Sequence, residues 1–165
     1  MVVVVPLLAW AAALAAAGVA VARGPRPVSR AFVIERLLRY LFFFPVGLMG
    51  LWAFMGHVFV PEEAARGIGW MPSPFQREVG MANLGIGIAG IAAAFRGRDF
   101  RLATAIVTAC FLIGAGIGHI YEIAKTGNLA PGNAGPILFT DFLTPLALIV
   151  LLSMERSDPA KGPAR

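Results

Sequence analysis

One short motif occurs twice in the chain, as Gly56-His57-Val58-Phe59 and as Gly118-His119-Ile120-Tyr121. Each copy lies near the end of a long apolar run. A carboxylate follows each histidine in the next apolar run: Glu78 comes 21 residues after His57, and Asp141 comes 22 residues after His119. Ionisable side chains are costly in a bilayer, so they normally face the interior of a helix bundle or a cavity. The two motifs therefore indicate where a site lies in a chain built mainly of apolar helices.

The composition is that of a protein dissolved in lipid. The chain is 58% hydrophobic and 14% charged, whereas a soluble domain is about 45–50% apolar and about 25% charged. The net charge of +5 could suit nucleic acid, but the basic residues lie between the apolar runs, where membrane topology explains them. We therefore expect the lipid bilayer as a partner and no nucleic acid. The single Cys110 excludes an internal disulfide and a multi-cysteine metal site.

Five runs are long enough to cross a bilayer, which takes about 20 helical residues. They cover residues 2–21, 37–60, 73–95, 100–124 and 136–154. The prediction is an all-α protein of five transmembrane spans, with spans two to five forming a four-helix bundle of two similar hairpins. Its expected parts are a first transmembrane helix at 1–22, a basic cytoplasmic connector at 23–36, the membrane bundle at 37–154 and a polar cytoplasmic tail at 155–165.

The positions of Lys and Arg predict the orientation. If the N-terminus lies outside, the cytoplasmic pieces hold five, three and three basic residues, and the outer pieces hold three. Cytoplasmic loops carry the excess of basic residues in membrane proteins, so we expect the N-terminus outside and the C-terminus in the cytoplasm. No basic residue precedes the first run, and a cleaved signal peptide would need one. We therefore expect this run to be a retained helix.

Local patterns give further expectations. Ser73 to Gln76 has the residues of a capping box, which predicts that Gln76 bonds back to the start of its helix. Residues 61–71 suit a polar outer connection with Ile68 and Trp70 at the interface, and residues 34–38 suit a helix lying along the inner interface. Closely packed small-residue surfaces are expected in two spans. They contain Gly85, Gly87 and Gly90, and Gly114 and Gly118.

The polar residues fall at one depth. His57, Glu78, His119 and Asp141 all belong to the predicted outer leaflet, and the inner half of the bundle carries almost no comparable groups. Two imidazoles and two carboxylates form a ligand set that suits Zn, Mn or Fe, and helix bundles commonly hold such ions between facing helices. Glu122 lies one helical turn after His119, so it could add a ligand or orient the imidazole.

Other interpretations of these residues stay open. Two histidines on parallel helices could hold haem b axially. A quinone head group could instead bond to a histidine and a carboxylate between apolar walls that include Trp52, Phe54, Phe59 and Phe75. Candidate contacts to such a cofactor are Gln76, Asn83, Glu122, Trp52 and Phe75. The plainest alternative is that the acids favour helix N-terminal dipoles and the histidines tie the bundle together, with Asn83 bonding a neighbouring helix.

Residues 69–84, Gly118–Tyr121, Pro131–Gly135 and Asp141 carry a family resemblance. Over roughly residues 40–152 the chain resembles a family of small bacterial multi-pass membrane proteins of unknown function. It is similar, more distantly, to DoxX-like four-helix membrane proteins, which are associated with quinone-linked redox systems. The resemblance implies the bacterial inner membrane and favours a quinone by analogy with that class alone.

The function predicted from these observations is a metal- or quinone-linked redox subunit of the membrane with an outward-facing pocket of histidines and carboxylates. The alternative is a non-catalytic accessory subunit, because the chain is small and has a smooth apolar first span. Such a subunit would pack against a larger membrane complex or form a homo-oligomer. No nucleophile–base pair or nucleotide-binding loop is present to indicate a reaction.

Overall fold

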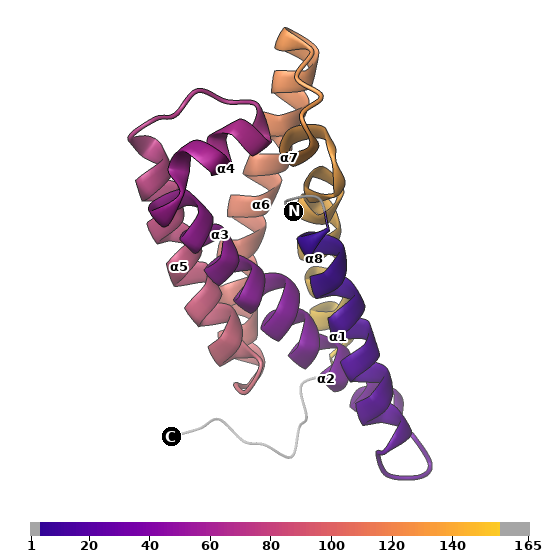
Figure 1. Ribbon diagram of the computed structural model, residues 1–165. Helices are drawn as coiled ribbons and strands as arrows, with labels where there is room; N and C mark the ends of the chain where they lie inside the picture. The colour runs from indigo at the N-terminus through magenta and orange to yellow at the C-terminus, as the bar shows by residue number, and fades with distance from the viewer. Residues whose placement is uncertain (1–3, 156–165) are drawn as a thin grey trace.

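The computed structural model describes residues 4–155, and every regular element in that part of the chain is helical (Figure 1). In chain order the elements are α1 (Val5–Ala22), α2 (Arg30–Leu41), the π-helix η1 (Phe42–Leu48), α3 (Met49–Phe59), α4 (Pro61–Ile68), α5 (Phe75–Ala93), α6 (Arg98–Thr126), α7 (Pro131–Ala134) and α8 (Pro136–Met154). The predicted all-α class is confirmed.

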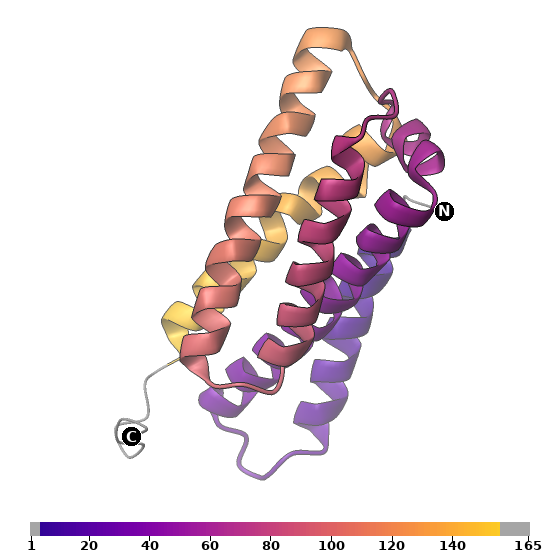
Figure 2. The same ribbon diagram turned by 90° about the vertical axis from the view of Figure 1, so that its left-hand side faces the viewer.

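Four helical segments among residues 4–155 are long and apolar enough to cross a membrane, by length and composition. They are Val5–Ala22, Arg30–Phe59, Arg98–Thr126 and Pro131–Met154. The predicted third span, α5, is not among them, because its 19 residues carry Gln76, Arg77, Glu78 and Asn83 as well as four glycines. It nevertheless runs the length of the bundle beside α3 and α6 (Figure 2).

The elements α2, η1 and α3 form one continuous rod across the molecule (Figure 1). Pro45 lies in the middle of η1. Because proline has no N–H and its ring clashes with the carbonyl four residues earlier, an α-helix cannot pass through it undisturbed. The wider π turns accommodate it here, so the kink expected at a helical proline takes the form of a π segment.

The rod and α5 form the first of two helix pairs, and they approach each other through glycines. A Cβ on Gly50 would come within 2.7 Å of the Cα of Gly87, and a Cβ on Gly90 would come within 2.7 Å of the backbone nitrogen of Gly47. Small residues of this kind let helix backbones touch.

The second helix pair is α6 and α8, which pack with Gly116 against the ring of Phe142. The expected close packing at Gly114 and Gly118 of α6, and at Gly85 of α5, is wrong. A Cβ at any of these three positions would meet no atom within 4 Å. Close approach of backbones through glycine is therefore a property of the first pair.

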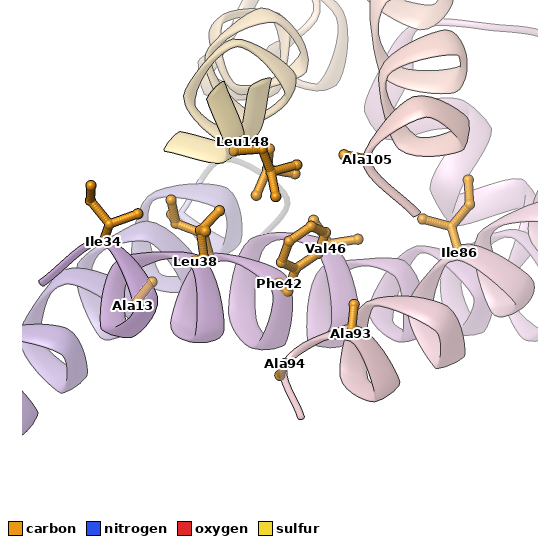
Figure 3. Packing of buried hydrophobic residues seen from close by; sticks show 12 residues of the cluster. Ala13, Ile34, Leu38, Phe42, Val46, Ile86, Ala93, Ala94, Ala105 and Leu148 are labelled. Carbon is orange, nitrogen blue, oxygen red and sulfur yellow. The ribbon is translucent and has the colours of Figure 1, made fainter. Parts of the chain in front are cut away.

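The apolar core lies at the end of the molecule where α2 begins and α8 ends. Leu38, Phe42, Val46 and Leu148 are its fully buried large side chains (Figure 3). Leu38 belongs to the segment expected along the inner interface, and Ile34 of the same segment is also buried in this core. That expectation is wrong, because α1 and α8 cover the face that would have met the interface. The core joins the two helix pairs at this end.

A buried cation closes the same end. Arg101 is 3% exposed, and it donates hydrogen bonds to the carbonyls of Ala93 and Ala94 at the end of α5. It also pairs with the carboxylates of Glu35 and Glu155, at 3.5 and 3.4 Å. The last carbonyls of a helix have no partner within it, and this side chain supplies one. This end, which was expected to carry almost no ionisable group, therefore does hold a buried one. We call this the arginine end, and the opposite end, with α4 and α7, the pocket end.

Candidate functional site

A cavity of about 990 Å³ opens between the two helix pairs at the pocket end. Its walls come from α1, η1, α3, α4, α5, α6, α7 and α8, and most of the lining side chains are apolar. The short helix α4 lies across this end between the pairs (Figure 1). The polar lining residues are His57, Glu63, Asn83, Thr108, His119, Thr140, Asp141 and Thr144. A large apolar cavity with a few converging polar groups is the usual form of a small-molecule site.

His119 and Asp141 meet in this cavity, as the sequence pattern predicts. The Nε2 atom of His119 lies 3.7 Å from Oδ2 of Asp141, and both side chains are buried, at 8% and 4% exposed. The distance is longer than a hydrogen bond. The carboxyl of Asp141 therefore faces the cavity with no hydrogen bond from the described residues.

Asn133 determines which nitrogen of the neutral His119 ring carries the hydrogen. The two amide N–H groups of Asn133 are directed at the carbonyl oxygens of Asn128 and His119, at 2.8 and 3.4 Å. The Oδ1 atom of Asn133 therefore faces His119 Nδ1, at 2.7 Å. Since an amide oxygen only accepts, Nδ1 must carry the hydrogen and donate it. In the neutral ring Nε2 is then an acceptor that points toward Asp141 and the cavity.

The connection between α6 and α8 places Asn133 in this position. Gly127 ends α6 with a φ of 70°, a conformation that glycine adopts without strain. Asn128 then bonds the end of α4 through the carbonyl of Ile68, at 3.0 Å. The short helix α7 follows and buries Asn133 completely. Trp70, just after α4, stacks on the His119 ring with 6.0 Å between ring centroids.

The first histidine has a different environment. His57 is half-buried and lines the cavity, but its Nδ1 lies 3.5 Å from the amide of Gln76 and not near a carboxylate. Glu78 is exposed on the outside of α5. Gln76 also donates to the carbonyl of Pro61, at 3.1 Å, so it ties α5 to the start of α4. The predicted capping role of Gln76 is wrong. The Ser73 hydroxyl accepts a hydrogen bond from the backbone N–H of Phe75, but the Gln76 side chain turns inward and does not bond back to Ser73.

The remaining candidates divide between the cavity and the surface. Trp52 and Asn83 line the cavity, and Asn83 donates to Val79 of its own helix, not to a neighbouring one as expected. Phe75 is 69% exposed and does not line the cavity. Glu122 is half-exposed, does not line the cavity, and makes no hydrogen bond or ion pair with His119 among the described residues, so its role toward that residue stays a prediction.

The four proposed metal ligands do not assemble. Among residues 4–155, no three His, Cys, Asp or Glu side chains come close enough to hold an ion together. His119 and Asp141 are the one pair of the four that meets, because Glu78 points away from the bundle. The geometry gives the metal interpretation no support. The haem interpretation stays a prediction.

Sequence reasoning missed several residues of the site. The role of Asn133 toward His119 became visible only in the fold. Trp10 of α1 donates to the hydroxyl of Thr144, at 3.2 Å, which makes the first helix part of the wall. The helix α4 carried a readable signal, since Pro61 begins it, acidic residues lie in its first turn and Gly69 ends it in the left-handed conformation.

The chain belongs to a family of unknown function (DUF6790), whose family model matches residues 3–161. The match extends well beyond the 40–152 expected from the quoted motifs, and it includes the first helix. No curated protein matches the chain. No solved structure matches it either.

Proposed function

We propose that this protein is a membrane subunit that holds a quinol, or a closely similar hydroxylated apolar molecule, in the cavity between its two helix pairs. The observation that carries the proposal is the buried pair of acceptors, Nε2 of His119 and the carboxyl of Asp141, on the wall of a mainly apolar cavity of about 990 Å³. This develops the quinone-linked interpretation of the sequence. It sets the metal-linked one aside.

The polar groups of the cavity call for a ligand that donates hydrogen bonds. Asn133 occupies the Nδ1 hydrogen of His119, so the neutral ring offers only the lone pair of Nε2. Asp141, when ionised, offers only acceptors. A quinol has two hydroxyl donors, whereas an oxidised quinone has only acceptors.

The apolar lining suits the rest of such a molecule. Trp10, Trp52 and Trp70 stand in three different walls, and Val79, Ile86 and Phe111 line the cavity among them. Burial of apolar surface stabilises a complex by about 25 cal/mol per Å². The aromatic and aliphatic lining therefore supplies affinity, and the acceptor pair sets the orientation of the head group.

We place the protein in the bacterial inner membrane with five crossings, the N-terminus outside and the C-terminus inside. The charge of the two ends supports this orientation. At residues 23–39 and 96–101 and at Glu155, eight arginines stand against three carboxylates. At the pocket end, Arg66, Arg77 and Lys125 stand against Glu62, Glu63, Glu78 and Glu122. The excess of basic residues belongs on the cytoplasmic side, so the cavity lies toward the outer leaflet.

Tryptophan fluorescence offers a direct test, because all three tryptophans of the chain line the cavity. The purified protein in detergent is titrated without oxygen with decylubiquinol and, separately, with decylubiquinone. We expect saturable quenching and tighter binding of the quinol. Asp141→Asn should weaken quinol binding roughly tenfold, the loss of a hydrogen bond to a charged group. Glu78→Gln, at an exposed carboxylate, is the matched control and should bind like the wild type.

Two outcomes would overturn the proposal. One is the absence of saturable quenching by either form. The other is an equal affinity for quinol in the wild type and in Asp141→Asn. A visible absorption spectrum of the same preparation tests the haem interpretation, since a bound haem would show its Soret band.

The accessory-subunit alternative has one observation in its favour. Helix α1 leaves Leu7, Leu8 and Leu14 between 52 and 60% exposed, so most of its surface faces lipid or another chain. Light scattering on the purified protein distinguishes the two. A stable monomer that binds quinol favours the first function, whereas loss of the fold outside a larger complex favours the alternative.

A further inference from the structure

A second hollow, of about 200 Å³, lies on the outside of the bundle near the arginine end. Its lining is Arg39, Tyr40, Phe43, Phe44 and Phe95. The rings contact one another, with 5.0 Å between the centroids of Phe43 and Phe44 and 6.3 Å between those of Phe43 and Phe95. Phe95 is 65% exposed. The hollow is thus a preformed aromatic surface with one guanidinium at its rim.

Positive charge exceeds negative charge beside this hollow. Three guanidinium groups, those of Arg36, Arg39 and Arg101, lie 2.9 to 3.5 Å from the single carboxylate of Glu35. Arg101 has a second partner in Glu155, which leaves three cations beside two anions. Arg39 uses Nε and Nη2 on Glu35, and its Nη1 makes no hydrogen bond among the described residues.

We propose that this hollow binds the anionic phospholipid of the surrounding leaflet, with the phosphate on Arg39 and an acyl chain along Phe43, Phe44 and Phe95. A guanidinium is a strong partner for phosphate, and basic pockets on the cytoplasmic side of membrane helices take anionic head groups. The aromatic rings extend from Arg39 along the rod toward the middle of the bundle, which is the direction that an acyl chain follows. The site is independent of the quinol cavity at the other end.

Native mass spectrometry of the full chain tests this site. The delipidated protein is mixed with dioleoyl phosphatidylglycerol or with dioleoyl phosphatidylcholine in the same detergent. We expect phosphatidylglycerol to bind at least about fivefold more tightly. Arg39→Gln should weaken it about fivefold, the effect of one basic residue at an anionic surface. The matched control is Arg23→Gln, which removes the same charge from the exposed connection between α1 and α2 and should change binding less than about twofold.

A second variant keeps the test independent of the Glu35 cluster. Phe95→Ala leaves every ion pair intact. It should also weaken phosphatidylglycerol binding, because the acyl chain of the lipid loses its contact with an exposed aromatic ring. Equal binding of the two lipids, or equal loss in the Arg23 and Arg39 variants, would overturn the proposal. So would full displacement of the lipid by millimolar inorganic phosphate, since that would make the hollow a plain phosphate site. Asp141→Asn should leave lipid binding unchanged.

Discussion

The two histidine motifs share a Gly-His pair followed by an aliphatic and an aromatic residue, and an acid follows 21 or 22 residues later, yet their surroundings differ. In the second copy His119 and Asp141 are both buried and face each other across 3.7 Å. In the first copy His57 lies beside Gln76, and Glu78 is exposed. Spacing along the chain thus places two residues at one level of a bundle but does not decide which way each side chain points.

Helical register explains the difference. The buried positions of α5 follow one face in steps of three and four, and they are Gln76, Gly80, Asn83, Ile86, Gly87, Gly90 and Ala93. Glu78 lies two residues after Gln76, or about 200° around the helix at about 100° per residue. Asp141 lies on the buried face of α8, beside Thr140, Thr144 and Pro145. Asp141, the acid that follows the second motif, therefore lies on the face that its helix turns toward the bundle. Glu78, the acid that follows the first motif, does not.

The largest effect that separates the two helix pairs should come from Gly87. A valine there would put its Cβ 2.8 Å from the backbone nitrogen of Leu51 and 3.0 Å from the carbonyl of Gly47, so α5 would have to move off the rod. We expect Gly87→Val to lower the free energy of unfolding by about 3 kcal/mol, the upper range for overpacking. Reversible unfolding in mixed detergent micelles measures this loss.

Two controls sharpen that result. Gly85→Val is on the same helix, and Gly118→Val is on α6 of the other pair, and at both positions an added Cβ meets no atom within 4 Å. Each carries the same change in helix propensity as Gly87→Val, so the difference isolates the contact with the rod. A loss at Gly118 as large as that at Gly87 would show that both pairs pack through glycine.

The next effect should come from Asn133. Asn133→Ala removes the partner of the buried His119 Nδ1 and two bonds to backbone carbonyls. We expect a loss of about 2 kcal/mol in unfolding free energy, because a buried polar group left unpaired costs about 1–3 kcal/mol. Its counterpart in the first pair, Gln76→Ala, removes the bond of 3.1 Å to the Pro61 carbonyl and the longer contact of 3.5 Å with His57 Nδ1, and it should cost about 1 kcal/mol.

Thermal unfolding of both variants under one detergent condition gives the comparison. Equal losses would mean that the two histidines are held equally well, and the contrast between the pairs would then be limited to the acids. A smaller loss for Asn133→Ala than for Gln76→Ala would contradict the assignment of Asn133 as the residue that fixes the His119 ring.

Much of the fold was readable from the sequence, because long apolar runs and their terminators depend on local chemistry. The long helices and the common level of His119 and Asp141 in the bundle belong to this part. The position of Glu78 was not found, although the spacing of Gln76, Gly80 and Asn83 marks a face of α5 that excludes it. Contacts that depend on tertiary packing, such as Trp70 on His119 and Asn133 beside its ring, have no local signature.

The smallest effect is expected at Glu78 itself. Because the side chain is exposed and makes no ion pair among the described residues, Glu78→Ala should change the free energy of unfolding by less than about 0.5 kcal/mol. Quinol quenching of the tryptophans should also be unchanged. The same measurements on Asp141→Asn should show weaker quinol binding. If the Glu78 variant lost quinol affinity as Asp141→Asn does, both acids would contribute to one binding cavity. The two motifs would then be equivalent in function despite their different surroundings.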